Sequence, residues 1–200
     1  DLDIDWKTET MVSSGATEGL AACFLGLLNQ GDEVVVIEPL YDCYLPMIER
    51  AGGIPKRVSV EPPEWKLNGS ALRAAFSDKT KLVLINSPQN PSSKVYHREE
   101  LLLIADLVKE HDAIAICDEV YEHMVYDNRQ HIPLMTLPGM RDRSIRIGSA
   151  GKTFSLTGWK VGYLTGSEEL LKAVSKAHQF LVFTTPPNLQ RAVADGLNGD

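Results

Sequence analysis

Short runs of β-branched and aliphatic residues alternate along the chain with longer segments whose apolar residues recur at helical spacing. The short runs predict buried strands, and the longer segments predict amphipathic helices. We expect strands at 34–37, 56–60, 81–85, 113–117, 145–147 and 161–164. We expect helices at 17–28, 42–51, 70–76 and 98–110, one capped by Ser167 and running to about residue 181, and a last one beginning at Pro186-Pro187.

Strands separated by helical segments predict βαβ units, whose consecutive strands run parallel. The runs at 34–37 and 113–117 lack polar alternation, so both faces of the sheet are expected to be covered. We therefore predict an α/β fold, with a mostly parallel sheet and helices on both faces.

Composition narrows the choice of partner. The net charge of −7 argues against nucleic acid, and no apolar run approaches the 18 or so residues of a membrane span. Cys23, Cys43 and Cys117 are widely spaced without a C-x-x-C pair, so we expect them to fill core space in a reducing cytoplasm. The chain opens at Asp1 without a methionine, and we expect it to be truncated at both ends.

Polar residues follow three of the predicted strands. Asn90 follows strand 81–85, Asp118 follows strand 113–117, and Lys152 follows strand 145–147. Ligands of open α/β sheets bind at the carboxyl ends of the strands, so we expect the chemistry of this protein at that edge.

The segment around Lys152 reads Gly148-Ser149-Ala150-Gly151-Lys152-Thr153. A nucleotide P-loop would need glycine at position 146, where this chain has Arg146. Two interpretations remain, namely a solvated surface lysine and a Schiff-base lysine placed beside anion-binding groups.

Asp118 is open to similar alternatives. It could cap a helix, or it could pair with the cationic ring nitrogen of a cofactor such as pyridoxal 5′-phosphate (PLP). A metal site is not favoured, because the histidines are scattered and none lies near Asp118 at ligand spacing. Tyr121, three residues later, faces the same ligand if the two share a turn, and is otherwise a core phenol.

Three further signals are weaker when taken singly. Residues 13–17 are small and precede a helix, so their N–H groups could bind a phosphate or simply cap that helix. Tyr41 follows a strand and could stack on a flat ring. Asn90 lies in a Pro-containing turn, where its amide could donate to a ring oxygen.

Taken in order, these motifs resemble the fold-type-I, class I/II aminotransferases, and most closely the group of kynurenine aminotransferase, glutamine transaminase K and bacterial methionine aminotransferase. The resemblance covers nearly all of the chain. It rests on Ser14-Gly15-Ala16-Thr17, Glu38-Pro39-Leu40-Tyr41-Asp42, Asn90-Pro91, Asp118-Glu119-Val120-Tyr121-Glu122, Ser149-Ala150-Gly151-Lys152-Thr153-Phe154 and Thr157-Gly158-Trp159-Lys160-Val161-Gly162.

The resemblance implies a PLP enzyme whose catalytic residues are Lys152, Asp118 and Tyr121. Lys152 would hold the cofactor as a Schiff base and move the proton between the substrate Cα and C4′. Asp118 would pair with the pyridinium nitrogen. Tyr121 and Asn90 would hydrogen-bond the phenolic oxygen of the ring. Other cofactor contacts would come from a stacking ring and from phosphate-binding groups: Tyr41, Gly15, Ala16, Thr17, Ser149 and Lys160.

The resemblance also implies substrates and partners. An aminotransferase of this group would move an amino group from an aromatic or sulfur-containing amino acid, such as methionine, kynurenine or glutamine, to a 2-oxo acid by a ping-pong mechanism. Alternatives are a β-lyase acting on cysteine conjugates and a non-enzymatic PLP-fold regulatory domain. Relatives are homodimers whose active sites lie at the subunit boundary.

Two departures from the family pattern affect the expectation. Ser93 stands where the family often has glycine, which predicts an altered turn after Asn90. We also expect residues 1–200 to be the PLP-binding large domain without the small domain, whose arginine grips the substrate carboxylate. The chain alone is therefore expected to bind PLP weakly and to transaminate poorly.

Overall fold

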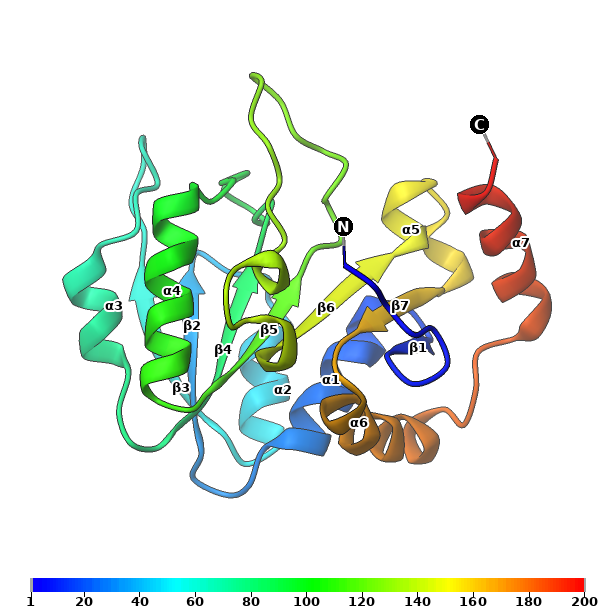
Figure 1. The fold of residues 1–200 in the computed structure, drawn as a ribbon, viewed down its shortest axis with the longest axis horizontal. Helices are drawn as coiled ribbons and strands as arrows, with labels where there is room; N and C mark the ends of the chain where they lie inside the picture. The colour runs from blue at the N-terminus through cyan, green and yellow to red at the C-terminus, as the bar shows by residue number, and fades with distance from the viewer. Residues whose placement is uncertain (1, 200) are drawn as a thin grey trace.

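The computed structural model describes residues 2–199, which form one seven-stranded sheet with helices around it (Figure 1). The strands are β1 (Thr10–Ser13), β2 (Glu33–Glu38), β3 (Ile54–Ser59), β4 (Thr80–Asn86), β5 (Ile114–Asp118), β6 (Ser144–Ser149) and β7 (Gly162–Thr165). The α-helices are α1 (Ala16–Leu27), α2 (Tyr44–Arg50), α3 (Gly69–Ala75), α4 (Arg98–Glu110), α5 (Ala150–Thr153), α6 (Glu168–Leu181) and α7 (Pro187–Leu197). Short 3₁₀ turns lie at Leu134–Thr136, Arg141–Arg143 and Thr157–Trp159.

The strand order is β1-β7-β6-β5-β4-β2-β3. The pairs β2–β3, β2–β4, β4–β5 and β5–β6 are parallel, whereas β7 runs antiparallel to both of its neighbours. The prediction of a mostly parallel sheet is confirmed. The parallel strands β4, β5 and β6 lie side by side, so their carboxyl ends meet at one edge of the sheet.

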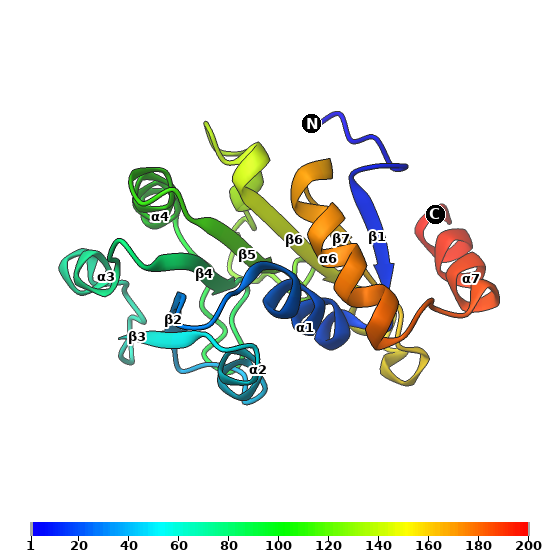
Figure 2. The same ribbon diagram turned by 90° about the horizontal axis from the view of Figure 1, so that it is seen from below.

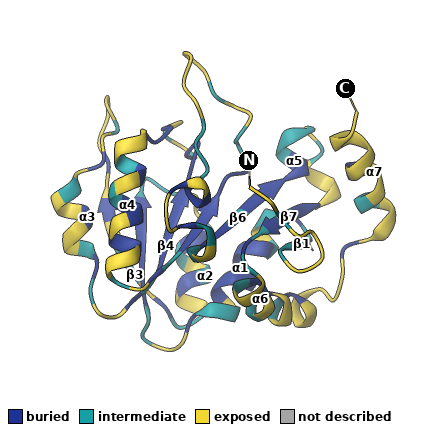
Figure 3. Cartoon of the chain, viewed as in Figure 1, coloured by how far each residue is buried: buried dark blue, intermediate teal, exposed yellow. Residues whose placement is uncertain are grey.

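Two hydrophobic cores cover the two faces of the sheet. Helices α3 and α4 pack on one face, and α1, α2 and α6 pack on the other (Figure 2). Strand β2 shows why its sequence lacks polar alternation: Val35 and Ile37 enter the first core, while Val34 and Val36 enter the second. The central strands β2, β4, β5 and β6 are accordingly mostly buried, whereas the edge strand β3 is largely not, and the outer faces of the helices are exposed (Figure 3). Helices on both faces were expected and are confirmed.

Each of the twelve expected elements is present, within a few residues of its expected bounds. Ser167 is the residue directly before α6, as expected, although its side chain makes no capping hydrogen bond. Pro46 lies in the first turn of α2, where a missing N–H is tolerated. The sequence did not predict β1 or the single-turn helix α5, because four residues give too little periodicity to recognise.

The cysteines do not pair: Cys23 and Cys117 are buried thiols and Cys43 is partly buried. None of the helices described for residues 2–199 combines the length and the apolar character that crossing a membrane requires.

Candidate active site

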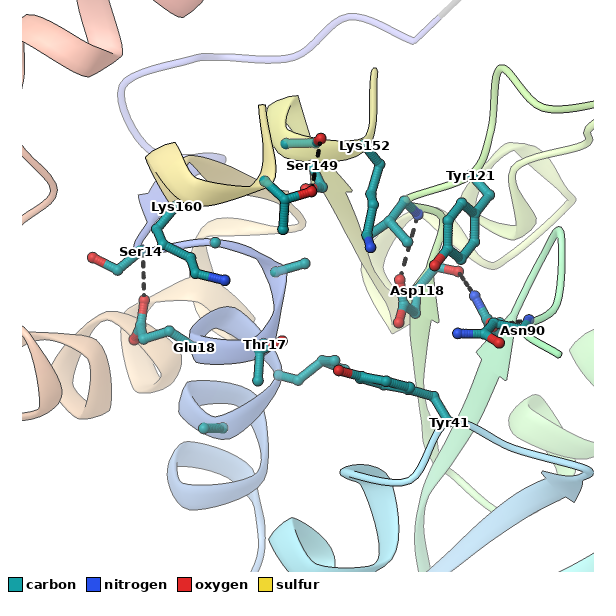
Figure 4. Close-up of a pocket in the computed structure, with 18 of the residues that line it drawn as sticks. Ser14, Thr17, Glu18, Tyr41, Asn90, Asp118, Tyr121, Ser149, Lys152 and Lys160 are labelled. Atoms are coloured by element: carbon teal, nitrogen blue, oxygen red, sulfur yellow. Dashed lines mark hydrogen bonds between the residues drawn. The ribbon is translucent and has the colours of Figure 1, made fainter. Parts of the chain in front are cut away.

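The residues that the sequence singled out lie around one pocket of about 570 Å³ at the carboxyl edge of the sheet (Figure 4). Every predicted site residue lines it: Gly15, Ala16, Thr17, Tyr41, Asn90, Asp118, Tyr121, Ser149, Lys152 and Lys160. They come from four neighbouring regions of the sheet edge and from the start of α1. The topology therefore brings together segments that lie more than 100 residues apart in the chain.

Asp118 forms the floor of the pocket as the last residue of β5, and it is only 4% exposed. Its Oδ2 accepts a hydrogen bond of 2.5 Å from the Tyr44 hydroxyl, and its Oδ1 a long one of 3.4 Å from the Val120 N–H. Burial raises the pKa of this carboxyl to about 6, although the hydrogen bond from Tyr44 and the charge of Lys152 act in the opposite direction.

Lys152 enters the pocket from the next strand. Strand β6 ends at Ser149, and α5 then turns the chain so that the Lys152 side chain points toward Asp118 and Tyr121 (Figure 4). The Lys152 ammonium lies 5.5 Å from the centre of the Tyr121 ring. A flat ligand between Asp118 and Lys152 would thus meet a carboxylate on one side and an amine on another.

Asn90 is held in place by a second asparagine. The Asn90 N–H donates to the side-chain oxygen of Asn86 at 2.7 Å, and the Asn86 amide donates to the Asp118 carbonyl at 2.9 Å. Because Asn86 is the last residue of β4, these bonds tie the Asn90 turn to the end of β5. Further along the turn, Ser93 has a positive φ of 59°, which explains why glycine suits this position.

The opposite end of the pocket suits an anion. Helix α1 begins there at Ala16, and the first N–H groups of a helix have no partner within it. Gly15 precedes the helix with φ of +79°, a conformation that glycine adopts without strain. The Lys160 side chain lies beside Gly15, and Ser149 lines the same pocket next to Gly162, which touches this loop. A cation and a helix N-terminus together attract a phosphate.

Sequence reasoning missed two groups that support these residues. Tyr44 is 2% exposed and bonds Asp118, and only its spacing of three from Tyr41 hinted at a shared face. Glu18 accepts a hydrogen bond from the Ser14 N–H at 3.0 Å and pairs with His178 of α6, also at 3.0 Å. The Glu18 carboxylate thereby links the loop before α1 to helix α6.

The donor set fits PLP. Among the described residues 2–199, no cation forms an ion pair with Asp118, and a buried carboxylate without a counter-charge is costly unless a ligand supplies one. A pyridinium nitrogen would supply it, while the phosphate of the same molecule would reach the end of the pocket near Gly15 and Lys160.

One group of side chains outside this pocket has the makeup of a metal site. Ligand atoms of Glu119, Glu122 and His131 lie within 4.8 Å of one another. However, the guanidinium of Arg146 bonds Glu119 at 2.9 Å and also bonds Glu122. Because a cation already neutralises both carboxylates, the cluster is an ion-pair network behind β5 and β6.

Comparisons with known proteins agree with this geometry. The family model for aminotransferase class I and II matches residues 1–200. Among curated proteins, kynurenine–oxoglutarate transaminase from Dictyostelium discoideum is 46% identical over 212 residues, covering 98% of this chain and 49% of that protein. Kynurenine–oxoglutarate transaminase 1 from Homo sapiens is 44% identical over 204 residues, covering 96% and 48% respectively.

Solved structures give the same picture. YbdL from Escherichia coli, described as having a methionine aminotransferase function, superposes with a TM-score of 0.96 at 35% identity, over 100% of this chain and 53% of that one. N-succinyldiaminopimelate aminotransferase from Mycobacterium tuberculosis superposes with a TM-score of 0.96 at 42% identity, over 98% and 52%. The chain thus spans about half the length of the proteins that it matches.

Proposed function

Because the chain belongs to the aminotransferase class I and II family, we propose that it carries the cofactor-binding part of a PLP-dependent aminotransferase. The enzyme moves an amino group from an amino acid to a 2-oxo acid by a ping-pong mechanism. The main support for the proposal is that Lys152 and Asp118 face a single pocket whose other end suits a phosphate.

Each residue then has a chemical task. When bound, PLP supplies an electron sink for the negative charge that develops at the substrate Cα. Lys152 would hold the cofactor and would move the proton at the substrate Cα. Asp118 would keep the ring nitrogen protonated, and Tyr121 and Asn90 would hydrogen-bond the phenolic oxygen.

The remaining contacts orient the ring. Tyr41 offers an aromatic face at the pocket wall, where it is 38% exposed and available for stacking. Phosphate binding falls to a group of residues at the start of α1 and near β6: Gly15, Ala16, Thr17, Ser149 and Lys160. Lys160 gives a point charge there, which holds a phosphate less specifically than the fork of an arginine.

Aromatic or sulfur-containing amino acids are the proposed donors. A second hollow of about 790 Å³ shares Asn90 and Tyr121 with the cofactor pocket, and Trp65, Met124 and Tyr126 line it together with several polar and charged side chains. Aromatic and thioether groups of this kind pack well against apolar substrate side chains. The relatives named above for kynurenine and methionine support the same class.

We also propose that residues 1–200 form the large domain of a longer homodimeric enzyme, and that this enzyme is cytoplasmic. The matched relatives are about twice as long as this chain, which supports the assignment of residues 1–200 to one domain of a longer enzyme. Three unpaired cysteines, of which Cys23 and Cys117 are buried, support a reducing compartment.

An amino-transfer assay tests the proposal. Purified full-length protein receives methionine or kynurenine with PLP and a 2-oxo acid, and the amino acid formed from that oxo acid is measured by mass spectrometry. We expect transfer, and we expect Lys152→Ala to abolish it. The same protein is also given a cysteine conjugate in place of the amino acid. A β-lyase would release ammonia and pyruvate from this conjugate. Such release, with no new amino acid formed in any of the assays, would contradict the proposal.

A further inference from the structure

Tyr44 connects two groups that the proposed function assigns to the cofactor ring. Its hydroxyl donates to Asp118 Oδ2 at 2.5 Å, and its ring meets the Tyr41 ring edge-on, with centroids 5.7 Å apart and an interplanar angle of 84°. Asp118 is the candidate partner of the ring nitrogen, and Tyr41 is the candidate stacking residue.

The local backbone explains why one tyrosine reaches both. Tyr44 is the first residue of α2, and its N–H donates to the Tyr41 carbonyl at 3.2 Å. This turn places the two rings on the same side of the chain. The Tyr44 ring then extends toward β5 across the core beneath the pocket, where it is 2% exposed.

Burial makes the arrangement rigid and keeps the hydroxyl a donor. The Tyr44 ring packs in the core formed by α1, α2 and α6, among residues such as Ile48 and Leu84. Burial and the nearby charge of Asp118 raise the pKa of Tyr44 well above its usual value, so the phenol stays protonated at working pH. A donated proton stabilises the ionised form of a carboxylate.

We propose that Tyr44 is a positioning residue that fixes the Asp118 carboxylate and the Tyr41 ring in the geometry that grips the PLP ring. The inference rests on the proposed function. It assigns to Tyr44 no contact with the reacting atoms. Tyr44 bonds Oδ2, so the other carboxylate oxygen would be left for the ring nitrogen, since its one hydrogen bond within the described part of the chain is the long one from the Val120 N–H.

The test uses full-length apo-protein titrated with PLP, followed by absorbance. Tyr44→Phe removes the hydroxyl and keeps the ring. We expect it to weaken PLP binding by about tenfold or more, the range typical of a hydrogen bond to a charged group. Tyr96→Phe is the matched control, because the Tyr96 hydroxyl is equally buried but has no hydrogen-bond partner among residues 2–199. We expect that control to bind PLP like the wild type.

A second readout separates positioning from mere structural support. The protein is loaded with PLP carrying ¹⁵N in the ring, and the nitrogen resonance is recorded. Without the Tyr44 hydroxyl the Asp118 carboxylate becomes a stronger base, so we expect the Tyr44→Phe resonance to move toward that of an unprotonated pyridine. Should Tyr44→Phe fail to fold, 3-fluorotyrosine at position 44 strengthens the donor, and the resonance should move the other way.

An unmoved resonance, or equal loss of affinity from Tyr44→Phe in the wild type and in an Asp118→Asn background, would overturn the role of Tyr44. Those results leave the proposed function standing as long as borohydride still fixes PLP to Lys152. Absence of that adduct in the wild type would instead remove the proposed function itself.

Discussion

The burial of the Asp118 carboxyl lowers the stability of the folded protein and prepares a binding site for a cation. Its carboxyl is buried without an ion pair among the described residues, and burial raises its pKa to about 6. Charging a carboxylate there is unfavourable until a cation pairs with it directly. The Tyr44 hydroxyl reduces that cost and does not remove it.

Asp118→Asn should therefore stabilise the PLP-free protein at neutral pH. Because the folded-state pKa lies above the unfolded one, the folded protein binds more protons, and stability falls as the pH rises from about 4 to about 6. Asparagine carries no charge, so we expect a gain of about 3 kcal/mol at pH above 7. Urea unfolding of both apo-proteins measures it. A gain that is the same at pH 4 as at pH 7.5 would show that ionisation is not its cause.

Ser93 has an unfavourable backbone conformation that a glycine would relieve. Its φ of 59° lies in the left-handed region, and its side chain is exposed, so nothing in the packing compensates the strain. Ser93→Gly should raise the free energy of unfolding by about 1 kcal/mol, net of the greater freedom of glycine in the unfolded chain. Thermal unfolding of the variant tests this. Ser93→Ala keeps a Cβ and should give no gain, and a gain there would contradict the explanation.

Among the elements, the close approach of β7 to the start of α1 shapes the phosphate end of the pocket. A Cβ added at Gly162 would lie 2.7 Å from the Ala16 nitrogen and 2.7 Å from the Gly15 carbonyl carbon. Both are backbone atoms of the loop that the proposed function assigns to the phosphate. The glycine thus lets the strand and this loop touch.

Gly162→Ala should accordingly displace the loop. We expect a loss of stability of about 1–3 kcal/mol, as for overpacking elsewhere, together with weaker PLP binding. Gly158→Ala is the control, since a Cβ there meets nothing within 4 Å. Chemical unfolding and PLP titration of the two variants give the comparison. Equal behaviour of both variants would contradict a role for the close approach.

The elements also show what sequence could and could not predict. Strand β5 was predictable because a buried apolar run leads directly to Asp118, and its carboxyl end was the expected place for a ligand. Strand β1 was not, because Thr10–Ser13 is short and lies at the sheet edge. The Tyr44–Asp118 bond was also out of reach, since it joins residues 74 positions apart through the packing of α2 against the sheet.

At the scale of the molecule, the sheet brings the start of α1 and the ends of β2, β4, β5 and β6 to one pocket. The chain is about half as long as its matched relatives, so other parts of the enzyme are proposed to complete substrate binding. We therefore expect residues 1–200 alone to bind PLP more weakly than the full-length protein, by at least tenfold, and to show little transamination. PLP titration and turnover assays compare them. Full turnover by the 200-residue chain would contradict this division of labour.

Borohydride reduction of the PLP-loaded full-length protein, followed by digestion and mass spectrometry, identifies the lysine that holds the cofactor. We expect the PLP adduct on the peptide that contains Lys152. In Lys152→Ala we expect no adduct on the corresponding peptide, because the variant lacks the amine that faces Asp118. An adduct on Lys160 or on any other lysine, or no adduct in the wild type, would contradict the assignment of this pocket to PLP.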